Sequence, residues 1–235
     1  MFFASRGCTI LATDLDPGQS NPDWITTGQH AASLAAIHQP LLLDRARFEE
    51  LVSFTPVDMC NLNGLQTDYD FLWSSCALEH LGSLEAGMDF IMKSAQLLRK
   101  DGIAVHTTEF NVTSNTGTVE TGASVIYRQR DIQALAQRLN EMGCALVSPD
   151  FNVGSHRFDM EYDLPPYMQS DRRHIKLLLD GQVATSMLLI VKRWGMLDTA
   201  FKSVAPAHPS KLPVGKRWSR LASRLRQRVL GRIFR

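Results

Sequence analysis

Acidic and histidine side chains follow several short apolar runs of this 235-residue chain, and they are its clearest candidates for chemistry. Asp14 ends the first run, Asp58 follows the second, His80 lies just past the third, and Glu109 follows the fourth. A carboxylate at a strand end can hold the two hydroxyls of a ribose by charge-assisted hydrogen bonds, which are roughly twice as strong as neutral ones. A histidine or glutamate at the same edge can act as a general base.

Each of these residues also has a plainer explanation. Asp14 stands beside Pro17 and Gly18 and fits a turn former, and Asp58 alone fits a surface carboxylate. His80 fits the cap of a following helix equally well. A functional site is therefore indicated only by the positions of these residues taken together, and not by any one of them.

The elements that position these residues are predicted by hydrophobic periodicity. Short apolar runs predict buried strands, and apolar residues spaced three and four apart predict helices that pack on a sheet. The alternation predicts one mostly parallel α/β domain, in which ligands bind beyond the carboxyl ends of the strands. The predicted strands are 9–13, 52–54, 71–73, 103–105, 145–147 and 186–191, and the predicted helices are 83–100, starting at Ser83, and 131–142.

Composition excludes several classes of protein. With 44% apolar and 21% charged residues the chain fits a folded domain, and no apolar run approaches the roughly 20 residues that span a bilayer. The four cysteines form no Cys-x-x-Cys pair, so neither a zinc site nor a disulfide framework is indicated and a reducing cytoplasm is expected. His106 and Glu109, three apart on a strand, face opposite sides, which argues against a shared metal site and places His106 in the core.

The charge is divided unevenly along the chain. The last 34 residues hold ten of the 25 basic residues and no acid, which leaves residues 1–201 with a net charge of −9. We expect a domain over 1–201, a proline-containing linker over 202–215 and a basic amphipathic helix over 216–235. Such a helix favours an anionic inner-membrane surface, and the acidic domain disfavours nucleic acid. Folding back onto the acidic domain is the alternative, and co-sedimentation with anionic vesicles distinguishes the two.

Four segments carry a resemblance to a known family: ATDLDP (12–17), VDMCNL (57–62), DYDFLWSSCALEHL (68–81) and LLRKDGIAVHTTE (97–109). Together they resemble the class I S-adenosylmethionine-dependent methyltransferases, in particular the small-molecule, type-11-like group. Residues 185–193 are similar to the last, antiparallel strand of that fold. The resemblance covers about residues 5–194 and implies a Rossmann-like, mostly parallel sheet with helices on both faces.

The resemblance also implies a cofactor and the residues that bind it. S-adenosylmethionine would be the cofactor, with Asp14 and its neighbour Leu15 at the ribose. Asp58 would take the adenine amino group and Met59 the edge of the ring, and Ser75 would complete the cofactor contacts. Methyl transfer to a small-molecule or glycan acceptor is the activity this implies.

The catalytic residues implied for a hydroxyl acceptor are His80 or Glu109, either of which would serve as base. Two further segments could border the acceptor. The polar segment 111–122 follows the predicted fifth strand of the family, and 162–167 carries two tyrosines on a proline-stiffened loop that suits a lid. A surface excursion without a role is the alternative for the second segment.

One family feature is not found. The glycine-rich loop that follows the family's first strand has no counterpart, because Arg6-Gly7-Cys8 directly precedes what resembles the second strand. We expect the first strand to be missing through a late start of the sequence, which would leave two strand edges unpaired. The alternative is a catalytically degenerate homologue that acts as a binding or adaptor protein through its basic tail.

Overall fold

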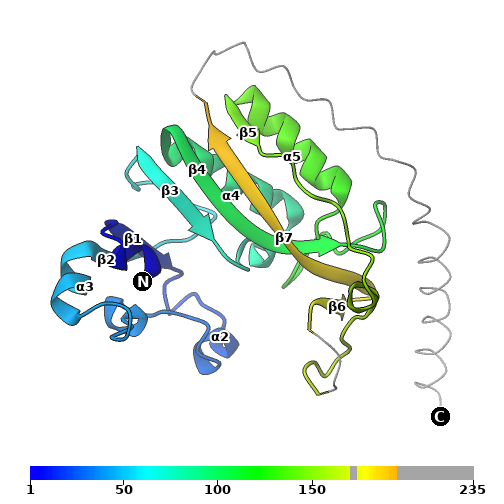
Figure 1. Cartoon of the computed structure of the whole chain (residues 1–235), viewed down its shortest axis with the longest axis horizontal. Helices are drawn as coiled ribbons and strands as arrows, with labels where there is room; N and C mark the ends of the chain where they lie inside the picture. The colour runs from blue at the N-terminus through cyan, green and yellow to red at the C-terminus, as the bar shows by residue number, and fades with distance from the viewer. Residues whose placement is uncertain (170–173, 195–235) are drawn as a thin grey trace. The chain divides into compact units, whose positions relative to one another are not determined.

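The computed structural model describes residues 1–169 and 174–194 (Figure 1). The chain divides into two compact units, Met1–Leu65 and a second that begins at Gln66, and each is described by itself. The predicted linker (202–215) and basic helix (216–235) lie outside the described residues. No helix among the described residues is both long and apolar enough to cross a membrane.

The first unit contains a parallel pair of strands with a small core beneath it. β1 (Ile10–Asp14) and β2 (Val52–Pro56) run in register, with Asp14 opposite Pro56 at their carboxyl ends. Four short helices complete the unit, and the buried core consists of Ala4, Phe48, Leu51 and Val52. The helices are α1 (Phe2–Ser5), α2 (Pro22–Thr26), η1 (Leu34–Ile37) and α3 (Arg45–Leu51).

The second unit is a five-stranded mixed sheet. Its strand order is β3-β4-β7-β5, with β6 paired to β7. β3 and β4 are parallel, whereas β7 is antiparallel to β4, β5 and β6. The predicted α/β class and the antiparallel last strand are confirmed. The strands are β3 (Tyr69–Ser74), β4 (Leu98–Asn111), β5 (Cys144–Leu146), β6 (Lys176–Leu179) and β7 (Gln182–Arg193).

Among the described residues, β1 pairs only with β2 and β3 pairs only with β4, so each of these strands has one edge without a backbone partner. The missing strand itself stays a prediction.

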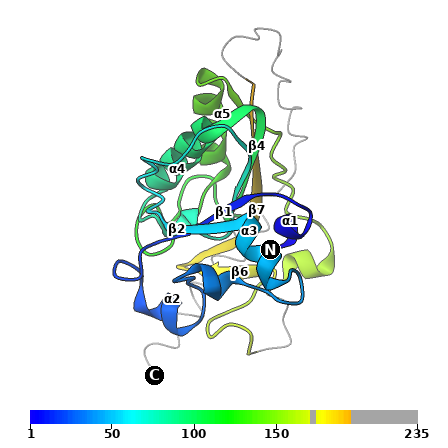
Figure 2. The same cartoon turned by 90° about the vertical axis from the view of Figure 1, so that its left-hand side faces the viewer.

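Helices α4 (Leu84–Leu97) and α5 (Gln129–Glu141) lie on the same side of the sheet (Figure 2). Ser83 caps α4 by accepting a hydrogen bond from the amide of Ala86 at 3.1 Å, as the sequence predicts. The helix ends at Leu97, three residues before the predicted boundary at 100. Leu98 is already extended and begins β4, so Asp101-Gly102 lies within β4 rather than ending the helix. Short helices η2 (Leu78–His80) and η3 (Arg157–Met160) complete the unit.

His106 lies in the core between β4 and α4, as predicted. It is fully buried, its Nδ1 lies 2.8 Å from the hydroxyl of Ser74, and the ring of Phe90 packs edge-on at 5.4 Å. Burial lowers the pKa of His106 to about 4. The folded protein therefore keeps this imidazole neutral at pH values where a histidine of the unfolded chain is charged.

This burial predicts a pH-dependent loss of stability. As the pH falls from about 6.5 to about 4, the unfolded state takes up a proton that folded His106 does not, so the free energy of unfolding decreases by up to about 1.4 kcal/mol per pH unit. We expect His106→Gln to show a shallower decrease over this interval in urea denaturation. Identical slopes for the wild type and the variant would contradict the burial of a neutral imidazole.

Candidate functional site

Asp14 lies at the carboxyl end of β1, where the sequence places it, and its carboxylate organises the following loop. Oδ1 accepts a hydrogen bond from the amide of Leu15 and Oδ2 one from the amide of Ala31, each at 2.8 Å. The Nε2 atom of His30 lies 3.8 Å from Oδ1, and the Asp14 side chain is 31% exposed. Since each carboxylate oxygen has two lone pairs, one on each oxygen is left for a ligand. Asp14 is thus both a turn former and an available acceptor.

Asp58 and Met59 follow the carboxyl end of the neighbouring strand β2. The amide of Val57 donates to the carbonyl of Asp14 at 2.8 Å, so the ends of the two strands are joined directly. Asp58 is exposed, and its Oδ1 accepts the amide of Cys60 at 2.8 Å in a tight turn. The structure therefore brings Asp14, Leu15, Asp58 and Met59 to one edge of the first unit.

Ser75 follows β3 in the second unit, next to the end of β4. Its hydroxyl accepts a hydrogen bond from Thr107 at 3.3 Å, and the Thr107 hydroxyl accepts the amide of Cys76 at 2.9 Å. Cys76 has a φ of 47°, a left-handed conformation that is uncommon for residues other than glycine. Ser75 is thus held at a sharp turn beyond the strand end, on the exposed side.

His80 and Glu109 interact electrostatically, together with a third group that the sequence did not indicate. Burial raises the pKa of Glu109, while the charges of His80 and His174 lower it. Glu79 is 2% exposed, its Oε2 has no hydrogen-bond partner in the described structure, and burial raises its pKa, with Glu109 adding to the effect. Burial makes the charged form of a carboxyl group less favourable, and this effect outweighs the hydrogen bonds and the charge of His80 that lower the pKa of Glu79.

His80 does not cap the following helix, which is the simpler explanation that the sequence left open. Ser83 is the N-cap of α4, and Nδ1 of His80 lies 2.7 Å from the carbonyl of Ala123 instead. The amide of Val125 also donates to the carbonyl of Glu79, at 2.9 Å. The turn that carries Glu79 and His80 is therefore fixed to segment 123–125.

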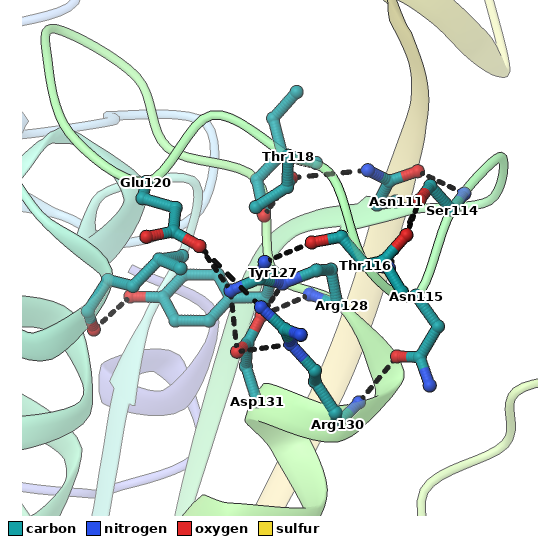
Figure 3. Close-up of polar contacts among 12 residues, drawn as sticks. Asn111, Ser114, Asn115, Thr116, Thr118, Glu120, Tyr127, Arg128, Arg130 and Asp131 are labelled. Atoms are coloured by element: carbon teal, nitrogen blue, oxygen red, sulfur yellow. Dashed lines mark hydrogen bonds and ion pairs between the residues drawn. The ribbon is translucent and has the colours of Figure 1, made fainter.

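The segment after β4, one of the two predicted to border the acceptor, is organised by buried polar side chains (Figure 3). The side-chain nitrogen Nδ2 of Asn111 lies 3.1 Å from acceptor oxygens of Gly117, Thr118 and Gln182. Its side-chain oxygen Oδ1 accepts hydrogen bonds from the backbone amides of Thr113 and Ser114. These contacts cross-link residues 113–118 to each other and to β7. The hydrogen bonds of Asn111 thus hold this loop against the end of β4 and the start of β7.

Arg128 anchors the far end of the same segment. Only 3% of this residue is exposed, and its guanidinium contacts the carboxylates of Asp131 at 2.7 Å and Glu120 at 2.7 Å and the carbonyl of Thr116 at 2.6 Å. Figure 3 shows these groups converging on Arg128, with Arg130 at the edge of the cluster. A buried guanidinium with this many acceptors is well satisfied, but removing it leaves carboxylates without their partner.

We expect Arg128→Met to reduce the free energy of unfolding by about 3–5 kcal/mol, because Asp131 then loses its buried partner. Arg130→Met is the matched control: its side chain is 48% exposed, its nearest carboxylate oxygen lies 3.7 Å away, and we expect a loss below about 1 kcal/mol. Urea denaturation measures both. Equal, small losses would contradict the anchoring role of Arg128.

The other predicted border segment, 162–167, is tied to the second unit. The Tyr167 hydroxyl donates to the carbonyl of Leu178 at 2.7 Å. The ammonium group of Lys176, a residue that is 3% exposed, donates to the carbonyl of Val153 at 2.7 Å and to that of Asp159. Leu178 and Lys176 both belong to β6, a strand that the sequence did not predict. A role for 162–167 as a lid stays a prediction.

No family model matches the sequence, and no curated protein matches it. Among solved structures, the chain is similar to an S-adenosylmethionine-dependent methyltransferase from Methanosarcina mazei, with 11% identity and a TM-score of 0.46 over 81% of this chain and 84% of that one. It is also similar to one from Mesorhizobium loti, with 13% identity and a TM-score of 0.43 over 79% and 80% of the two chains. A third is the CcbJ methyltransferase from Streptomyces caelestis, with 13% identity and a TM-score of 0.45 over 82% and 78%.

Proposed function

We propose that this protein is an S-adenosylmethionine-dependent methyltransferase that acts on a small-molecule or glycan acceptor. The observation that carries the proposal is the pair of acids at the carboxyl ends of the adjacent parallel strands β1 and β2. Val57 joins the two ends by its 2.8 Å hydrogen bond to Asp14, so both acids belong to one edge. Carboxyl ends of parallel strands are where such sheets bind nucleotide-like ligands.

The donor and acceptor chemistry of this edge fits the adenosine part of S-adenosylmethionine. Asp14 retains one lone pair on each oxygen for two ribose hydroxyls, after serving the amides of Leu15 and Ala31. The exposed Asp58 uses Oδ1 within its own turn, which leaves Oδ2 to accept an amino group. Met59 is half-buried beside it and offers a polarisable contact for a ring. Ser75, which follows β3 in the second unit, stays a predicted cofactor contact.

When bound, S-adenosylmethionine would supply an electrophilic methyl group on a sulfonium. The protein then needs mainly to orient the acceptor and exclude water, which contributes about 7–11 kcal/mol to lowering the barrier when the geometry is good. His80 and Glu109, which interact electrostatically in the second unit, are proposed to contact the acceptor. Glu79, which precedes His80, is 2% exposed. The cross-linked segment 111–122 is proposed to form its border.

We expect Asp14→Asn to weaken binding of S-adenosylhomocysteine about tenfold or more, because one charge-assisted hydrogen bond to the ribose is lost. Asp16→Asn is the matched control, since Asp16 is exposed and its Oδ1 accepts only the amide of Gly18. Isothermal titration on the full chain measures both variants. Absence of binding to the wild type would contradict the proposed function, whereas equal affinities for the wild type and Asp14→Asn would contradict the role of Asp14 alone.

A further inference from the structure

Asp163 and His174 form a second pair of ionisable side chains in the second unit, to which the sequence assigned no catalytic role. The Nδ1 atom of His174 lies 2.9 Å from Oδ2 of Asp163. Asp163 is 2% exposed, and it also accepts the backbone amides of Leu164 and Met168, each at 2.9 Å. These hydrogen bonds, with that from His174 the largest contribution, hold the pKa of Asp163 below its ordinary value.

The backbone around this pair is fixed on both sides. The amide of Asp163 donates to the carbonyl of Lys176 at 2.7 Å, and the amide of Leu178 donates to the carbonyl of Asp163 at 2.9 Å. The ring of Tyr167 packs edge-on against the imidazole of His174 with centroids 5.6 Å apart. The imidazole is therefore held by a buried carboxylate and by an aromatic ring, both attached to β6.

This arrangement determines which nitrogen carries the proton. An ionised carboxylate only accepts hydrogen bonds, so the neutral ring of His174 has its proton on Nδ1, towards Asp163. The lone pair is then on Nε2, on the side away from the carboxylate. The His174 side chain is 34% exposed, so the ring is only partly covered. A carboxylate at Nδ1 also stabilises the imidazolium that forms when Nε2 takes a proton.

The pair lies near the candidate acceptor residues. Lys176 of β6 pairs with Thr185 of β7, and Thr185 pairs with Phe110 of β4, next to Glu109. The charge of His174 acts on Glu109, as does that of His80. Nδ1 of His80 lies 2.7 Å from the backbone carbonyl of Ala123, whereas Nδ1 of His174 faces the carboxylate of Asp163.

We propose that His174 is the general base for a hydroxyl acceptor and that Asp163 is its positioning residue. The inference rests on the proposed methyltransferase function and names the acceptor class as an alcohol or phenol. The acceptor O–H bond breaks, its proton goes to Nε2 of His174, and the electron pair stays on oxygen. That oxygen forms a bond to the methyl carbon while the carbon–sulfur bond breaks, its electron pair remaining on sulfur in S-adenosylhomocysteine. Asp163 stays ionised, and His174 returns its proton to water.

The first test measures the Nε2 lone pair without an acceptor. Diethyl pyrocarbonate modifies neutral imidazoles, and mass spectrometry of the full chain gives the rate at each histidine. We expect rapid modification of His174 and about a tenfold slower rate in Asp163→Asn, since the amide no longer fixes the tautomer. Asp180→Asn, an exposed turn residue between β6 and β7, is the matched control and should leave the rate unchanged. An unreactive His174, or equal rates in the wild type and Asp163→Asn, would overturn the proposal.

The second test follows tritiated methyl transfer from S-adenosylmethionine to phenol and to 4-nitrophenol, which is ionised in neutral to alkaline buffer and needs no base. We expect His174→Gln to lower transfer to phenol by about 100-fold or more and transfer to 4-nitrophenol by less than about threefold. Equal losses with both phenols would overturn the base role. If the wild type methylates neither phenol, the modification rates decide.

Titration with S-adenosylhomocysteine separates this inference from the proposed function. We expect Asp163→Asn and His174→Gln to bind S-adenosylhomocysteine like the wild type, because neither residue belongs to the first unit's edge. Normal binding with an unreactive His174 overturns the dyad alone. No binding with a reactive His174 overturns the methyltransferase proposal and leaves the dyad as a base that serves another reaction.

Discussion

Hydrogen bonding along both edges of β4 is the constraint on which the second unit depends. β4 pairs in parallel with β3 and antiparallel with β7, so none of its residues can shift by one position without moving its side chains to the opposite face of the sheet. This register sends His106 into the core against α4 and leaves Glu109 on the other face. It also sets Asn111 at the strand end, where that residue organises the following loop. The arrangement of the candidate site is therefore a consequence of strand pairing.

Burial of charge shapes the chemistry that this framework can support. Glu79 and Glu109 both have raised pKa values because they are buried, and His80 and His174 counter the effect at Glu109. Arg128 shows the opposite solution, in which a buried charge is neutralised by direct pairing with Asp131 and with the exposed Glu120. This paired cluster stabilises a loop.

The sequence predicted the elements with strong periodicity and missed what depends on distant contacts. The apolar runs ending at Thr13, Trp73 and Val191 and the cap at Ser83 are local signals, and the structure confirms them. The early end of α4 could not be predicted, because Leu98 becomes extended and pairs with Tyr69 of β3, a residue distant in the sequence.

Among the candidate residues, Asp14, Asp58 and Glu109 were found from their positions after apolar runs, which is a local pattern. Asp163 was not, because an acid beside two prolines has the sequence of an ordinary turn. Its burial and its contact with His174 depend on the pairing of β6 with β7. Glu79 lies in segment 68–81, which carries the family resemblance, but its burial could not be predicted because it depends on what packs over the turn.

Hydrogen–deuterium exchange of the full chain with and without S-adenosylhomocysteine tests the central claim most directly. If the protein binds this ligand through the strand ends, exchange slows at the amides of residues 14–16, 58–60 and 75–76, while α5 is unaffected. Protection that is absent from all three segments, or confined to other parts of the chain, would contradict the methyltransferase assignment.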